Sequence, residues 1–218
     1  MSASPLRPLA ERLFTGYGRF SVLAFMGVVC TLDALISSRL RSAGAFASGV
    51  GIVIGMFEEF STALLLILFV PMGIALFRQR LHGAMRAVIL YLGFTIVQVV
   101  LDVLGMVTSA HLLDGRGLGS MWDVAITYSL SVLVFTFVYL IADLWVQDGA
   151  FVWPAREGQP PPTPTFLDYL FISLNVNSTY GPTSEAVMAR PVKLLMSLQV
   201  LLAILMLTVL IARAASAL

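Results

Sequence analysis

The sequence predicts an all-α integral membrane protein, a polytopic bundle of about five transmembrane helices with one short re-entrant helix. Of the 218 residues, 59% are hydrophobic and only 11% are charged, against roughly 25% charged in an ordinary soluble domain. The mean hydropathy is +0.93, and the apolar residues fall into long uncharged blocks of the kind that a bilayer accepts as helices. This composition excludes a soluble globular protein, and a formal net charge of +1 without runs of like charges excludes nucleic acid as a partner.

The N-terminal membrane helices are expected within residues 1–113. Apolar segments cover residues 20–38, 43–77 and 86–113. The second segment would be about 50 Å long as one helix, which exceeds the roughly 30 Å hydrocarbon core. It is therefore either one protruding helix, giving five crossings in all, or two pieces that turn at Glu58 and Glu59, giving six.

A second unit is expected over residues 122–218. Its first helix, residues 122–146, has Trp122 and Trp145 at its ends as interfacial anchors. A proline-rich loop, residues 147–165, follows and is expected to be extended and outside the membrane. The last span covers residues 191–213.

A short helix is expected between this loop and the last span, over residues 165–175. Its start is marked by Thr165 and Asp168, whose spacing fits a capping box. Its apolar stretch spans only about 17 Å, too little to cross a bilayer. A polar stretch, residues 176–185, comes next.

The order of helix, stiff loop, capped half-length helix, polar hairpin and last helix resembles the pore module of tetrameric potassium-type ion channels. The resemblance covers residues 122–213 and implies that the short helix points its negative C-terminal end at a cation. The following loop would then supply the oxygen atoms around the ion. It implies a homo-oligomer, a tetramer if a pore, that passes monovalent cations.

The filter of that family, Thr-Val-Gly-Tyr-Gly, aligns here with a degenerate loop in which only the Tyr-Gly pair matches. A proline follows where the family has aspartate. The resemblance therefore implies weakly selective cation permeation. The filter-like loop consists of Asn175, Asn177, Ser178, Thr179, Tyr180, Gly181, Pro182 and Thr183.

Polar side chains inside the apolar segments offer an alternative. Because a carboxylate within a bilayer is costly, each must face a partner, water or the protein interior. The intramembrane polar residues are Asp33, Glu58, Glu59, Gln98, Asp102 and Asp143. They either line a proton path, cation path or ligand cavity, as in a proton-coupled transporter or ligand-binding membrane protein, or form hydrogen bonds between helices.

Two of these residues belong to polar stripes on successive helices. Thr95, Gln98 and Asp102 recur at helical spacing, and Ser129, Thr136 and Asp143 are each seven apart. We expect these two stripes to face each other. Adjacent Glu58 and Glu59 cannot share one helical face, so they predict no paired-carboxylate catalytic site.

Motifs for enzymatic chemistry are absent from the sequence: there is no zinc-protease motif, phosphate-binding glycine loop or nucleophile elbow. No catalytic, metal-binding or cofactor-binding residue is predicted, and a single cysteine, Cys30, excludes an internal disulfide. A non-conducting scaffold subunit is a further alternative. All basic residues but Lys193 are arginines, which is typical of a GC-rich bacterial genome. The expected location is therefore a bacterial inner membrane.

The charge bias bears on orientation. With five crossings, most basic residues fall on the side of the N-terminus, which the positive-inside rule places in the cytoplasm. The filter-like loop then faces the cytoplasm, whereas the resemblance implies that it faces outward. Six crossings turn the loop outward but leave most of the basic residues outside.

Overall fold

The computed structural model describes residues 18–42, 50–77, 81–109, 121–146, 149–154, 163–178 and 185–216. Almost all of these residues are helical. The elements in chain order are α2 (Gly18–Ser42), α3 (Val50–Phe77), α4 (Leu81–Ser109), α5 (Met121–Trp145), β1 (Phe151–Val152), α6 (Phe166–Asn177), β2 (Ala186–Val187) and α7 (Arg190–Ser216).

Five of the helices are 25 to 29 residues long, which exceeds the roughly 20 residues that a bilayer crossing needs. Within the described residues, four helices are long and apolar enough to cross a membrane: Phe20–Arg39, Met85–Val107, Trp122–Trp145 and Arg190–Ala212. The prediction of a helical, multi-pass membrane protein is confirmed at this level.

Helix α3 bears on the number of crossings. It runs without a break through Glu58 and Glu59. The six-crossing alternative required a turn at these two residues, and that expectation is wrong. Apolar residues lie on both sides, at 50–57 and 63–70. They favour a continuous helix, because a turn among them would leave backbone N–H and C=O groups unpaired in apolar surroundings.

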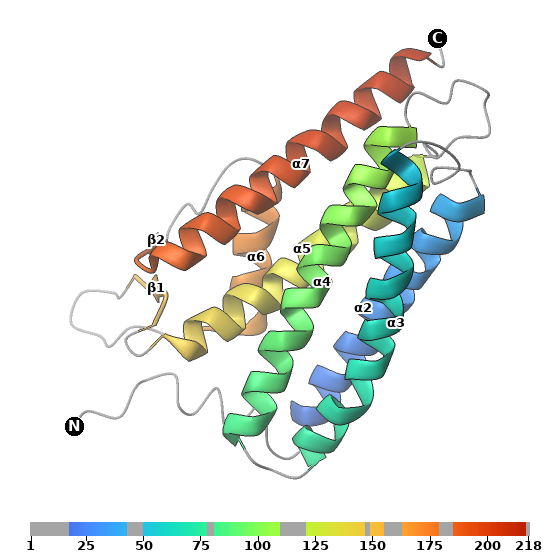
Figure 1. Ribbon diagram of the computed structural model, residues 1–218. Helices are drawn as coiled ribbons and strands as arrows, with labels where there is room; N and C mark the ends of the chain where they lie inside the picture. The colour runs from blue at the N-terminus through green and yellow to red at the C-terminus, as the bar shows by residue number, and fades with distance from the viewer. Residues whose placement is uncertain are drawn as a thin grey trace, which may run out of the picture.

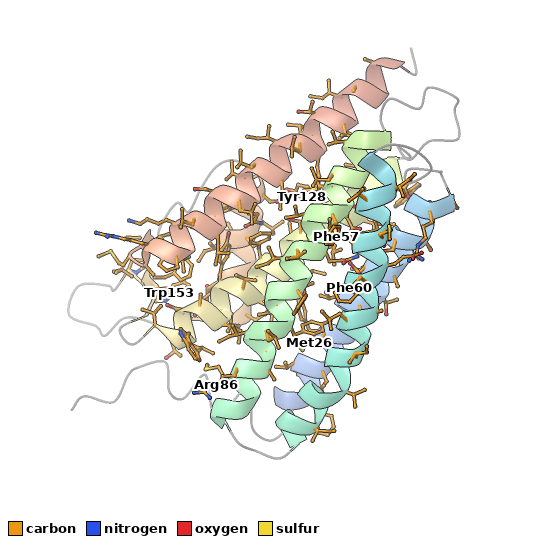
Figure 2. The ribbon with its side chains drawn as sticks, in the orientation of Figure 1. Met26, Phe57, Phe60, Arg86, Tyr128 and Trp153 are labelled. Carbon is orange, nitrogen blue, oxygen red and sulfur yellow. The ribbon has the colours of Figure 1, made fainter. Side chains whose placement is uncertain are left out.

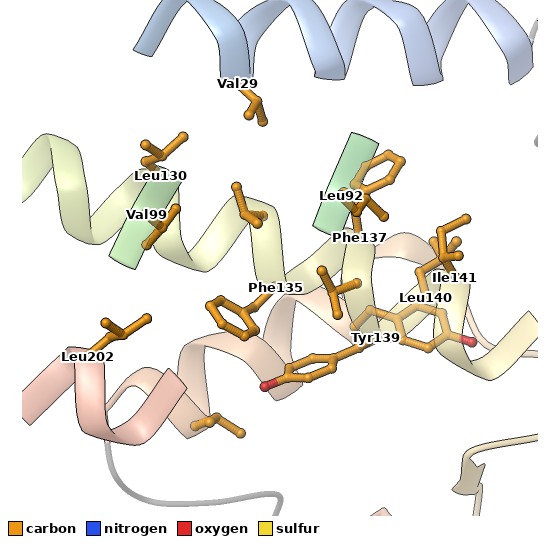
Figure 3. Packing of buried hydrophobic residues seen from close by; sticks show 14 of the residues in the cluster. Val29, Leu92, Val99, Leu130, Phe135, Phe137, Tyr139, Leu140, Ile141 and Leu202 are labelled. Atoms are coloured by element: carbon orange, nitrogen blue, oxygen red, sulfur yellow. The ribbon is translucent and has the colours of Figure 1, made fainter. Parts of the chain in front are cut away.

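Helix α5 lies at the centre of the bundle (Figure 1), where it packs against α2, α4, α6 and α7. Helix α3 lies on the far side, against α2 and α4. The side chains of Leu130, Val134, Phe135 and Tyr139 are completely buried. Figure 3 shows that α2, α4 and α7 each direct aliphatic side chains toward this stretch of α5, so α5 forms the shared core.

A two-stranded antiparallel ribbon connects the end of α5 to the start of α7. Phe151 of β1 pairs with Val187 of β2, and Val152 pairs with Ala186. The chain turns into β1 at Gly149, whose φ of 82° suits glycine. The ribbon therefore closes a loop that leaves from α5, includes α6, and returns to the same end of the bundle.

Candidate functional site

Helix α6 begins at the capping residues that the sequence marks. The Asp168 carboxylate accepts hydrogen bonds from the backbone N–H of Thr165, at 2.6 Å, and from its hydroxyl, at 2.8 Å. Both halves of a capping box are present, which confirms the predicted helix start. The helix covers Phe166–Asn177, two residues further than the predicted range of 165–175.

The path of α6 is fixed by contacts with the middle of α5. The Ser173 hydroxyl donates to the Val132 carbonyl at 2.8 Å, and the Ser131 hydroxyl donates to Oδ1 of Asn177 at 3.4 Å. Ser131 lies about 21 Å before Trp145 along the helix axis, at 1.5 Å per residue. The C-terminal end of α6 therefore reaches the middle of α5.

Three residues of the filter-like loop fall within the described chain. The side-chain Nδ2 atoms of Asn175 and Asn177 are buried and have no hydrogen-bond partner among the described residues. Ser178 is exposed, and its hydroxyl donates to the Asn175 carbonyl at 3.0 Å. Thr179, Tyr180, Gly181, Pro182 and Thr183 lie outside the described residues.

Gln199 of α7 holds the C-terminal end of α6. Its Nε2 donates to the carbonyl and the hydroxyl of Ser173, at 3.1 and 3.0 Å, and lies 3.4 Å from Oδ1 of Asn177. Its Oε1 accepts a hydrogen bond from the Tyr139 hydroxyl at 2.5 Å. Our sequence reasoning missed this amide. The available signal was a lone glutamine in an otherwise apolar stretch of the last span, and the structure buries it completely.

Asp143 holds the N-terminal part of α6 and the start of the loop that leaves α5. Its Oδ1 accepts hydrogen bonds from the backbone N–H groups of Ala150, at 2.5 Å, and Phe151, at 3.0 Å. Its Oδ2 accepts from the Tyr169 hydroxyl at 2.6 Å and from Nε1 of Trp153 at 3.3 Å. Four donors thus satisfy this buried carboxylate, which makes it a structural anchor.

Tyr169 lies in α6, outside the candidate spanning segments. Burial, together with the charge of the adjacent Asp143 carboxylate, raises the pKa of the Tyr169 phenol above its ordinary value. The hydroxyl therefore keeps its proton at neutral pH and acts as a hydrogen-bond donor to Asp143.

A separate polar cluster lies between α2, α3 and α4. The carboxylates of Asp33, Glu58 and Asp102 are at most 1% exposed and lie close enough to repel one another electrostatically. Oδ1 of Asp33 and both carboxylate oxygens of Glu58 and Asp102 have no hydrogen-bond partner among the described residues. The guanidinium of Arg41 reaches Glu58 at 3.8 Å. We call Asp33, Glu58 and Asp102 the acidic cluster.

The acidic cluster does not extend to its neighbouring glutamate. Glu59 is exposed and forms an ion pair of 2.9 Å with Arg41, whereas Glu58 is buried. The two glutamates therefore lie on different faces of α3, as their adjacency predicts. Within the described residues, no group of three histidine, cysteine, aspartate or glutamate side chains is arranged to hold a metal ion.

The expectation that the stripes containing Asp102 and Asp143 face each other is wrong. Thr95, Gln98 and Asp102 are buried on one face of α4, but Asp102 meets the acidic cluster while Asp143 meets Tyr169. The first half of α4 lines a groove with the last third of α5, so the two helices are antiparallel. Both aspartates lie near the C-terminal ends of their helices and are therefore at opposite ends of the bundle.

No protein-family profile, curated protein or solved structure matches the chain.

Proposed function

We propose that the chain is the subunit of a homo-oligomeric cation pore, with α5, α6 and α7 as the pore-forming unit and α2 to α4 as an accessory bundle. In this arrangement five long helices cross the membrane, and α6 enters it and returns to the same side. Residues 175–183 form the constriction.

The observation that carries the proposal is the path of α6. This helix starts near the C-terminal end of α5 and ends beside Ser131, in the middle of α5. The strand β2, which follows it in the chain, pairs with β1. A half-length helix of this kind directs the partial negative charge of its C-terminus toward the membrane interior, where it favours a cation.

The length of the connection after α6 supports an assembly of several copies. Six residues, Thr-Tyr-Gly-Pro-Thr-Ser, separate Ser178 from Glu185, too few for a helix that crosses a bilayer. Under the proposal this connection lies at membrane depth, where backbone polar groups need covering protein or a water-filled cavity beside them. A ring of four copies, with one loop from each, would supply both conditions.

The test is potassium and sodium flux from liposomes that hold equal amounts of wild type, Tyr180→Ala, Tyr128→Ala and Asp102→Asn. We expect wild type to release potassium faster than empty liposomes. We expect Tyr180→Ala to change the potassium-to-sodium ratio. Tyr128→Ala, a matched change on α5 outside the loop, should preserve it. The absence of flux from wild type, or equal ratios for the two tyrosine variants, contradicts the pore.

The acidic cluster favours a second candidate, a proton- or cation-coupled transporter. Among the described residues, the ion pairs give the acidic cluster one cationic contact, between Arg41 and Glu58 at 3.8 Å, so burial at this site favours uptake of a proton or another cation. In the same liposomes, a transporter would lose its flux in Asp102→Asn and keep its ion ratio in Tyr180→Ala. A scaffold subunit would produce no flux in any variant.

A further inference from the structure

An apolar groove lies on the bundle where α4, α5 and α7 meet. It has a volume of about 530 Å³, within the range of sites that hold small molecules. Three helices contribute aliphatic side chains to it, including Ile89, Leu92 and Ile96 from α4, Val138 and Ile141 from α5, and Leu195 from α7. Its interior therefore suits a hydrocarbon chain.

One end of the groove has a different character. Arg86 is the only charged residue among those that line it, and Trp145 and Pro191 line it as well. These three residues lie near the start of α4, at the end of α5 and at the start of α7. Tryptophan and arginine at helix ends are typical of the membrane interface. Figure 2 shows Arg86 at the corresponding end of α4.

The groove thus runs inward from the interface. Arg86 and Ile96 are separated by about 15 Å of helix, so the cation lies at one end of a hydrocarbon-lined channel of that length. The ion pairs among the described residues use Arg39 and Arg41 as cations, and none includes Arg86. The mouth of the groove therefore carries the positive charge of Arg86.

We propose that this groove binds one acyl chain of an anionic phospholipid, with the lipid phosphate at Arg86. An apolar channel with a cation at its interfacial end complements an amphiphile whose hydrocarbon chain lies inside the channel and whose anionic headgroup lies at its mouth. A guanidinium binds phosphate oxygens in a bidentate manner. Arg86 therefore gives the site its preference for anionic headgroups, and the apolar groove holds the acyl chain.

Gly93 offers a direct way to fill the groove. It lines the groove, and a Cβ added there would meet no atom within 4 Å, so a larger side chain projects into open space. Gly27 of α2 is equally open and lies outside the groove. Gly93→Leu and Gly27→Leu therefore form a matched pair in which only one substitution blocks the site.

The experiment uses the purified full chain in mixed micelles and phospholipids with brominated acyl chains, which quench nearby tryptophan. Trp145 is the reporter, and its contribution is the quenching that is lost in Trp145→Phe. We expect brominated phosphatidylglycerol to quench Trp145 saturably and at lower mole fraction than brominated phosphatidylcholine. Arg86→Gln should reduce that preference at least threefold. Gly93→Leu should abolish the saturable quenching, and Gly27→Leu should preserve it.

Three results would overturn the proposal. Equal quenching by the two lipids in wild type would show that the headgroup charge is not recognised. Unchanged saturable quenching in Gly93→Leu would place the lipid elsewhere. A change of oligomeric state in Gly93→Leu, measured by light scattering without any loss of lipid quenching, would make the groove a contact between subunits. Each of these readouts is independent of ion flux.

Discussion

The Tyr169 hydroxyl of α6 donates a hydrogen bond of 2.6 Å to Oδ2 of Asp143 in α5, a residue 26 positions earlier in the sequence. This contact joins the short helix to the end of the central helix. The same carboxylate accepts the backbone N–H groups of Ala150 and Phe151. One buried side chain thus fixes both the start of the loop after α5 and the N-terminal part of α6.

Tyr169→Phe is expected to lower the free energy of unfolding by about 1–3 kcal/mol. The substitution keeps the aromatic packing but leaves Oδ2 of a buried carboxylate without its closest donor. Chemical denaturation of the detergent-solubilised protein measures this change. Tyr128→Phe is the control, since the hydroxyl of Tyr128 forms no hydrogen bond with any described residue. Equal stability of the two variants would refute the anchoring role of Asp143.

Gln199→Leu should release the inner end of α6 from α7. The substitution preserves apolar volume but removes the partner of the Tyr139 hydroxyl and the donor to Ser173. We expect a loss of about 1–3 kcal/mol. In liposomes, we also expect an altered ion flux, because the end of α6 that precedes residues 179–184 is no longer joined to α7 by this amide. Ser197→Ala, on the exposed side of the same helix, should change neither quantity.

The start of α6 could be predicted from the sequence, while its partners could not. Capping depends on Thr165 and Asp168, three residues apart, so local chemistry determines it. The side chains that hold α6, from Asp143, Ser131 and Gln199, lie 22 to 46 residues along the chain from the groups they contact. Nothing local specifies which polar groups will meet at such separations. Gln199 was overlooked because one amide in an apolar helix forms no pattern.

The pairing of Asp102 with Asp143 was wrong for a related reason. Helical periodicity gives the face on which a residue lies, and Asp102 is indeed on a buried face of α4. It does not give the depth at which a neighbouring helix presents its own polar residues. That depth depends on the direction of each helix: α4 and α5 are antiparallel, and α2 and α3 bring Asp33 and Glu58 to the level of Asp102.

Asp102→Asn is expected to raise the free energy of unfolding by about 1 kcal/mol. It replaces one of three carboxyl groups that are buried close together, and both of its oxygens have no hydrogen-bond partner among the described residues. An amide at this position carries no charge to bury. Thermal unfolding of the detergent-solubilised protein measures the change.

Glu59→Gln is the matched control for the acidic cluster. Glu59 is adjacent to Glu58 but exposed, and its ion pair with Arg41 lies at the surface, where such pairs contribute about 0–1 kcal/mol. We expect a small loss of stability, of no more than about 1 kcal/mol. A stabilisation equal to that of Asp102→Asn would mean that repulsion within the acidic cluster is not the cause.

The five crossings that we propose would place the two ends of the chain on opposite sides of the membrane. The five long helices α2, α3, α4, α5 and α7 alternate in direction (Figure 1), and in the proposal α6 with its ribbon returns to the side from which it left and adds no crossing. Reporter domains that are active on only one side, fused in turn to each end, should therefore give opposite signals. We expect the N-terminal fusion to report the cytoplasm, because the basic residues gather on that side. Identical signals from both ends would require an even number of crossings, which α3 could provide only by lying along the membrane surface or by ending within it.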